Sequence, residues 1–166
     1  MRVTHEAFGA YFDELSQVLI LGSVPSPKSR EYGFYYAHPQ NRFWRVLPAL
    51  FGEPSLTGDI FAQKQFLTRH HIALWDVLDS CDIEGASDAT IRNPVANDMN
   101  IILRQAPIRA IFATGAKAAQ LYKKHCQPQC GVPVRQLPST SPANCAVKFD
   151  ALCEKYSVIK TILEQE

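Results

Sequence analysis

Residues 18–44 read VLILGSVPSPKSREYGFYYAHPQNRFW, and this stretch decides the fold that the sequence predicts. It begins with a run of Val, Leu and Ile, which is typical of a strand buried on both faces of a parallel sheet. A turn rich in Gly, Ser and Pro follows, then the aromatic residues 34–36, and then a His-Pro-x-Asn cluster before a predicted helix. Open α/β sheets bind ligands beyond the carboxyl ends of their strands, so we expect the functional site in this loop.

The rest of the chain alternates between predicted strands and helices. Strands are expected at residues 17–21, 71–75, 108–113 and 132–137. Helices are expected at residues 41–50, 60–70, 116–125 and 144–166, with a short one capped by Asn97 or Asp98 and ending at Gln105. A first helix, capped by Thr4, would carry Phe8, Tyr11, Phe12 and Leu15 on one stripe. Residues 81–93 and 127–131 are expected to be loops.

This alternation predicts an α/β fold, in which residues 1–166 form one domain. The expected architecture is a three-layer α/β/α sandwich with a short four-stranded, mostly parallel sheet. All four strand ends would then deliver their loops to one edge of the sheet.

The composition is that of an ordinary globular protein, with 46% hydrophobic and 20% charged residues. No apolar run approaches the roughly 20 residues that a membrane span needs, and the start of the chain lacks the hydrophobic region of a signal peptide. We therefore expect a cytoplasmic protein without a membrane partner. The formal net charge of +1 excludes a global basic field, so any positive charge that attracts nucleic acid must be local.

The five cysteines are an odd number in a chain without a signal peptide, which argues against a disulfide framework. Cys126, Cys130, Cys145 and Cys153 could be imagined as an iron–sulfur or zinc set, but their spacing matches no motif of either kind. We expect no metal site and assign no role to the cysteines.

Two loops rich in hydroxyl groups are candidates for contacts with phosphate. In the first, Ser26, Lys28 and Ser29 surround prolines, and hydroxyls, an ammonium group and free backbone N–H groups suit phosphate oxygens. The second, residues 138–142, reads PSTSP and follows the last predicted strand. Both are also ordinary turn sequences, and no glycine-rich phosphate loop is present.

The aromatic residues and the His-Pro-x-Asn cluster offer contacts for a planar ring. Base–aromatic stacking is worth roughly 1–3 kcal/mol per base, but three adjacent aromatic side chains cannot all face one way. Asn41 fits either a helix cap or a functional amide, placed where the helix N-terminus brings partial positive charge. His38 fits either a base contact or a structural histidine. No motif for covalent catalysis is present, so any chemistry must rest on positioning and electrostatics.

Several of these segments resemble the uracil-DNA glycosylase superfamily, and most closely its hypoxanthine-DNA (deoxyinosine) glycosylase branch. Residues 22–25, GSVP, resemble the first motif of the superfamily, and residues 137–142, LPSTSP, resemble the second. Residues 36–44, YAHPQNRFW, are similar to a block shared by that branch and the mismatch-specific uracil glycosylases. Residues 75–77 and 111–115 also fit in order and spacing, so the resemblance covers about the whole chain.

The resemblance implies a cofactor-free, monofunctional glycosylase. Such enzymes flip a damaged nucleotide out of DNA, hydrolyse its N-glycosidic bond and leave an abasic site. The expected partner is double- or single-stranded DNA that contains a deaminated base, bound by a monomer that is nucleoid-associated when engaged on DNA.

Together, the residue chemistry and the resemblance assign three groups of site residues. The catalytic residues are Asn41 and His38. The base contacts are Gly22, Ser23, Pro25, Phe34, Tyr36 and Asp76, with the flipped base stacked on Tyr36. The contacts with the DNA backbone are Ser26, Lys28, Ser29, Ser139, Thr140 and Ser141.

Two positions depart from the superfamily pattern. The third residue of the first motif is Asp or Asn in most branches and orients the attacking water, but here it is Val24, which has no polar side chain. Leu137 stands where several uracil-specific branches carry His or Asn. The polar role therefore passes to Asn41, as in the hypoxanthine branch, and hypoxanthine is the preferred base. The alternatives are a mismatch or uracil-type glycosylase and a catalytically silent nucleic-acid-binding relative.

Overall fold

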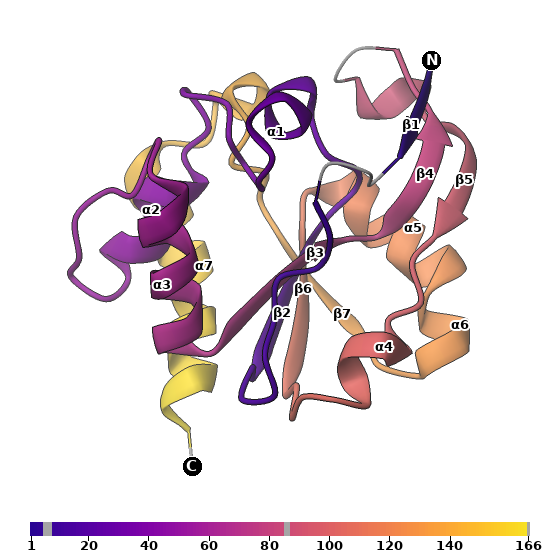
Figure 1. Ribbon diagram of the computed structural model, residues 1–166. Helices are drawn as coiled ribbons and strands as arrows, with labels where there is room; N and C mark the ends of the chain where they lie inside the picture. Colours follow the sequence, from indigo (N-terminus) through magenta and orange to yellow (C-terminus); the bar gives the residue numbers. More distant parts are fainter. Residues whose placement is uncertain (5–7, 85–86, 166) are drawn as a thin grey trace.

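Four parallel strands form the centre of the computed structural model, which describes residues 1–4, 8–84 and 87–165 (Figure 1). These strands are β2 (Val18–Gly22), β3 (Ile72–Asp76), β6 (Ala110–Thr114) and β7 (Val134–Leu137), in the order β3-β2-β6-β7. Every residue of β2 and β3 is buried, because helices cover both faces of the sheet. The predicted three-layer α/β/α sandwich is therefore confirmed.

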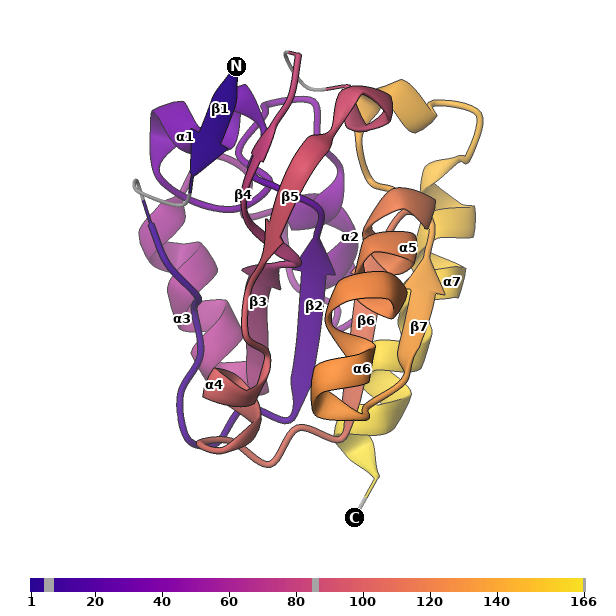
Figure 2. The same ribbon diagram turned by 90° about the vertical axis from the view of Figure 1, so that its right-hand side faces the viewer.

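One face of the sheet is covered by α2 (Phe43–Ala49), α3 (Ile60–His70) and α7 (Phe149–Glu164), and the other by α4 (Asn100–Leu103), α5 (Ala116–His125) and α6 (Gln127–Cys130) (Figures 1 and 2). Helix α3 begins where Asp59 accepts a hydrogen bond from the backbone N–H of Ala62, and it ends at the left-handed His71. Helix α1 (Pro27–Tyr32) lies beyond the carboxyl ends of the strands, inside the predicted functional loop (Figure 1). Among the described residues, no helix combines the length and apolarity that crossing a membrane would need.

The bounds predicted for α3 and α5 are confirmed, whereas other helices differ. Helix α2 begins at Phe43 rather than at residue 41, because the backbone N–H of Asn41 bonds back to the carbonyl of His38 in a turn. Helix α7 starts later than predicted, since Pro142–Asn144 forms a separate 3₁₀ turn, η2. The helix predicted to end at residue 105 shortens to α4, and the predicted loop at residues 127–131 contains α6, which ends at the left-handed Gly131.

The predicted loop at residues 81–93 is only partly correct, because its two ends belong to strands of a second, antiparallel sheet. Its strands are β1 (Arg2–Thr4), β4 (Leu78–Asp82) and β5 (Arg92–Ala96), in the order β1-β4-β5, and the 3₁₀ turn η1 (Asp88–Thr90) lies between β4 and β5. The Arg2 guanidinium donates to Ser80 Oγ and to the carbonyl of Asn93, both at 2.9 Å. The residues in these two bonded pairs are 78 and 91 positions apart in the sequence, so the local sequence pattern did not predict the bonds.

The predicted first helix is also wrong. Thr4 lies in β1, and Tyr11 forms an antiparallel bridge with Leu74 through two N–H···O bonds of 2.9 Å. The part of that prediction at residues 5–7 lies outside the described residues. Because β3 is the edge strand of the central sheet, its open N–H and C=O groups bind this segment in place of intrahelical bonds. Tyr11 still packs on the core, while Leu15 is exposed.

Candidate active site

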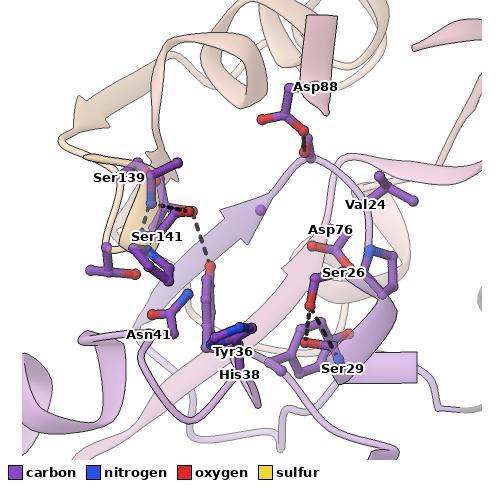
Figure 3. A pocket seen from close by; sticks show the side chains of 18 of the residues that line it. Val24, Ser26, Ser29, Tyr36, His38, Asn41, Asp76, Asp88, Ser139 and Ser141 are labelled. Carbon is purple, nitrogen blue, oxygen red and sulfur yellow. Dashed lines mark hydrogen bonds between the residues drawn. The ribbon is translucent and has the colours of Figure 1, made fainter. Parts of the chain in front are cut away.

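A cavity of about 340 Å³ opens beyond the carboxyl ends of β2, β3 and β6 (Figure 3). This volume falls within the roughly 300–1,000 Å³ typical of small-ligand sites. Its walls come from the loop between β2 and α2, from the ends of β3 and β6, from the connection between β4 and β5, and from residues 139–143. Segments far apart in the sequence therefore converge at the sheet edge where the functional site was predicted.

Gly22 and Asp76 face each other at the base of this cavity, as paired last residues of β2 and β3. Asp76 is only 3% exposed. A Cβ atom at Gly22 would stand 2.5 Å from Asp76 Oδ1 and 3.6 Å from Tyr36 Oη. The missing side chain of Gly22 is therefore what allows a buried carboxylate and a phenol to approach the same point.

Tyr36 forms one wall, with a face of its ring stacked on Phe43 at a centroid distance of 3.9 Å. Its hydroxyl lies 3.1 Å from Thr114 Oγ1. Because the single Thr114 hydroxyl hydrogen is donated to the carbonyl of Leu21, Tyr36 is the donor in the first bond. Burial, and then the negative charge of Asp76, raise the pKa of Tyr36, so the phenol stays neutral. The ring face opposite Phe43 is the one left for a planar ligand.

The two aromatic residues before Tyr36 are both buried, and Phe34 differs from the prediction. Phe34, predicted to contact the base, is 2% exposed, does not line the cavity, and stacks on Trp44 in the core. Tyr35 lines the cavity instead, and its hydroxyl donates to the carbonyl of Gly9 at 2.9 Å. The left-handed Gly33, with φ 78°, turns the chain immediately before this run. Phe34 and Tyr35 are equally buried, at 2% exposure each, and only Tyr36 of the three aromatic residues is partly exposed at the cavity, which residue type alone could not predict.

Asn41 both contacts the start of the next helix and lines the cavity, so its bond at the helix start does not remove its side chain from the candidate site. Its Oδ1 accepts a hydrogen bond from the backbone N–H of Phe43 at 2.9 Å. Its Nδ2 group has no hydrogen-bond partner among the residues that the structure describes. His38 lines the same wall (Figure 3), and its Nδ1 accepts from the backbone N–H of Gln40 at 3.0 Å, which leaves the hydrogen of the neutral ring on Nε2.

The hydroxyl groups of the first loop make local capping bonds while they line the cavity. Ser26 caps α1 by accepting from the backbone N–H of Ser29 at 3.1 Å, and Ser29 Oγ accepts from the N–H of Ala37 at 3.3 Å. Lys28 does not line the cavity, because it lies on the exposed side of α1 and pairs with Glu31 at 3.2 Å. A contact of Lys28 with the DNA backbone would have to be made outside the cavity.

The second hydroxyl-rich loop contributes a separate part of the wall (Figure 3). Ser139 Oγ accepts from the backbone N–H of Ser141 at 3.1 Å, and Ser141 Oγ accepts from that of Ala143 at 3.2 Å. Thr140 is 1% exposed, and its carbonyl accepts from the backbone N–H of Arg42 at 3.1 Å. This loop thus presents small hydroxylated side chains on a backbone held by several bonds.

Asp88 is a cavity residue that the sequence analysis missed. Its carboxylate accepts a hydrogen bond from Ser23 Oγ at 2.9 Å. Loss of hydration raises the pKa of Asp88, although this bond and the charge of Lys117 oppose the rise. Asp88 reaches the cavity because the pairing of β4 with β5 brings η1 over the sheet edge, and no local pattern signals that pairing. All of the predicted site residues except Phe34 and Lys28 line this cavity.

The described residues contain no group of three or more His, Cys, Asp or Glu side chains arranged to hold a metal ion. Cys81 and Cys126 are buried free thiols, and Cys145 is an exposed one. The side chains that line the cavity carry amide, hydroxyl, imidazole and carboxylate groups.

Comparison with known proteins supplies a family. The family model described as the uracil DNA glycosylase superfamily matches residues 10–161. A hypoxanthine DNA glycosylase of Methanosarcina acetivorans is 36% identical over 140 residues, covering 82% of this chain and 86% of that protein. One from Methanosarcina barkeri is 33% identical over 116 residues, covering 69% and 73%. A solution NMR structure of a Methanosarcina acetivorans protein assigned to the uracil DNA glycosylases has a TM-score of 0.78 at 32% identity and covers 93% of this chain and 96% of that one.

Proposed function

This chain belongs to the uracil DNA glycosylase superfamily, and we therefore propose that it is a DNA repair enzyme that hydrolyses the N-glycosidic bond of deoxyinosine. It would act as a monofunctional glycosylase that releases hypoxanthine and leaves an abasic site. Two relatives that share 33% and 36% identity carry the name hypoxanthine DNA glycosylase, which supports this choice of base. The observation that carries the proposal is the neutral carboxamide of Asn41 on the cavity wall, where Val24 supplies no polar group.

The cavity suits a planar base that enters with its edge toward the strand ends. The base would stack on the open face of Tyr36, whose other face rests on Phe43. Hypoxanthine offers an N1–H donor, and Asp76, nearly buried at the base of the cavity, can accept it. Adenine carries an acceptor at N1, so a carboxylate at this position would select against the undamaged base.

Bond cleavage by this route requires little nucleophilic push, because hydrolysis of a glycosidic bond passes through an oxocarbenium-like state. The electron pair of the C1′–N9 bond leaves with the base. The Nδ2–H group of Asn41 and the Nε2–H group of His38 would stabilise the negative charge that develops on it. Water then forms the new bond to C1′ and loses a proton, which the departing hypoxanthine anion takes up, and the second lone pair of Asn41 Oδ1 can orient this water.

Contacts with the DNA backbone must be local, because the net charge is only +1. Ser139 and Ser141 provide small hydroxylated side chains at the mouth of the cavity, on which phosphate oxygens can lie closely. Ser26 supplies a third hydroxyl group from the first loop.

The test uses an inosine-containing duplex followed by alkaline cleavage of abasic sites, with Asn41→Asp as the decisive variant. Aspartate can still accept the hydrogen bond from Phe43 N–H, so the fold should be preserved, but it cannot donate to the base. We expect the single-turnover rate to fall about 100-fold or more, the size seen when one transition-state donor is removed. Asn41→Ala, which loses both functions, serves as the second variant.

A panel of inosine, xanthine and uracil substrates separates the alternatives. Cleavage of G·U duplexes without cleavage of inosine would replace the proposal with a uracil-type glycosylase. No breaks with any substrate would indicate a nucleic-acid-binding relative without activity. A full rate in Asn41→Asp would remove the role assigned to the amide N–H group.

A further inference from the structure

We propose that Arg42 is a positioning residue that fastens the hydroxyl-rich loop at residues 138–147 to the start of α2. The loop that meets DNA and the amide that faces the base would then move as one unit. This inference rests on the proposed function, although it assigns Arg42 a task that the proposed chemistry does not use.

Three hydrogen bonds from Arg42 converge on that loop. Its backbone N–H donates to the carbonyl of Thr140 at 3.1 Å. In its guanidinium group, Nη2 donates to the carbonyl of Asn144 at 3.0 Å and Nη1 donates to the carbonyl of Val147. One residue thus binds the loop at three points, and it directly follows Asn41 in the chain.

Further hydrogen bonds connect the residues held by Arg42 to the residues of the loop that line the cavity. Asn144, whose carbonyl is held by Arg42, uses its side-chain Nδ2 to donate to the carbonyl of Ser139 at 2.9 Å. At the N-terminal end of the loop, the hydroxyl of Tyr156 in α7 donates to the carbonyl of Pro138 at 2.6 Å. The segment that carries Ser139 is therefore held between a fixed point on α7 and the Arg42 side chain.

The planar guanidinium group is essential to this arrangement, because it directs two N–H groups at two carbonyls at once. A lysine ammonium group keeps the charge but cannot reproduce the fork. The hydrogen-bond acceptors of Arg42 are neutral carbonyls, so these bonds leave its positive charge uncompensated directly beneath the loop. In a chain of net charge +1, this charge adds local attraction for a phosphate bound at Ser139 or Ser141.

The two contributions can be separated with Arg42→Lys and Arg42→Ala. Arg42→Lys should retain the salt dependence of binding to a duplex with a stable abasic-site analogue, measured by fluorescence anisotropy. Its single-turnover rate on saturating inosine duplex should nevertheless fall about 10- to 100-fold, as expected for a misplaced reacting group. Arg42→Ala should lose rate and also weaken binding, with a smaller salt slope. Methylguanidinium added to Arg42→Ala should restore part of the rate.

Arg45 provides the matched control, since it lies in α2 close to Arg42, is exposed, and donates to the carbonyl of Gln40 at 3.3 Å, outside residues 138–147. Arg45→Lys should keep the wild-type rate at saturation. Hydrogen–deuterium exchange gives a readout that does not depend on activity: residues 138–147 should exchange faster in Arg42→Lys than in wild type, while α3 and α5 stay protected. A wild-type rate together with unchanged exchange in Arg42→Lys would overturn the inference. Absence of inosine cleavage by the wild-type protein would instead overturn the proposed function. The hydrogen–deuterium exchange of residues 138–147 would still decide the role of Arg42.

Discussion

Replacing Gly22 with alanine tests whether the strand ends hold the Asp76 carboxylate in place. The added Cβ atom would lie 2.5 Å from Asp76 Oδ1, about 1 Å inside the ~3.5 Å at which non-bonded heavy atoms pack. The backbone cannot readily relieve this overlap, because Gly22 pairs with Asp76 across β2 and β3 and its carbonyl accepts from the N–H of Val77 at 2.8 Å. The Asp76 side chain must therefore move.

Such overpacking costs about 1–3 kcal/mol of the free energy of unfolding. The phenol of Tyr36 would be 3.6 Å from the new methyl group, an ordinary contact, so it need not shift. The loss of activity should be of similar size in free energy. A displacement of about 1 Å near the reacting centre lowers a rate by about 100-fold, which corresponds to about 2.7 kcal/mol in activation free energy.

Urea unfolding measures the loss of stability, and single-turnover cleavage of an inosine duplex measures the loss of rate. Gly9→Ala is the matched control, since a Cβ atom at Gly9 would meet no atom of the described residues within 4 Å, and both quantities should equal those of the wild type. Adding Asp76→Ala to Gly22→Ala removes the overlap, so the two stability losses should be less than additive, by about 0.5–3 kcal/mol. A wild-type rate in Gly22→Ala, or strictly additive losses in the double variant, would refute the reasoning.

Two further predictions concern groups outside the cavity. Iodoacetamide at pH 8 should label the exposed Cys145 first and spare Cys126, because burial raises the pKa of Cys126 to about 12. Peptide mass spectrometry measures the order of labelling, and rapid labelling of Cys126 would contradict this prediction. Burial works to raise the pKa of Glu53, but the hydrogen bond with His70 and the charge of Arg69 lower it overall, so Glu53→Gln should cost less than about 1 kcal/mol at pH 7. That contribution is present above the unfolded-state pKa of about 4.3 and is lost as the pH falls through the lower folded-state pKa. The free energies of unfolding of the wild type and Glu53→Gln, measured by urea titration, should therefore become equal below the folded-state pKa. A difference that does not change with pH would argue against the pairing.

Local features of the sequence were sufficient for the central sheet and for most of the cavity. Apolar runs mark β2, β3 and β6, since a strand covered on both faces needs apolar side chains, whereas β7 at the sheet edge keeps Arg135 and Gln136 exposed. The ends of α3 and α5 were also predictable, because helix periodicity and capping depend on residues within a few positions of each other. Once the strands are parallel, their carboxyl ends must share one edge, so Gly22, Asp76 and Ser139 had to converge there.

Tertiary structure alone decided the features that depend on distant hydrogen bonds and on backbone turns. The pairing of β1, β4 and β5 brings Asp88 to the cavity. At the open edge of β3, Tyr11 forms a β-bridge where a helix was predicted. After the left-handed Gly33, Phe34 and Tyr35 are both buried and only Tyr36 is partly exposed at the cavity, although all three aromatic side chains suit either place. Features that depend on residue chemistry and short-range spacing can therefore be predicted from the sequence. Distant segments, in contrast, compete for the same backbone N–H and C=O groups, and the outcome of that competition is seen only in the folded molecule.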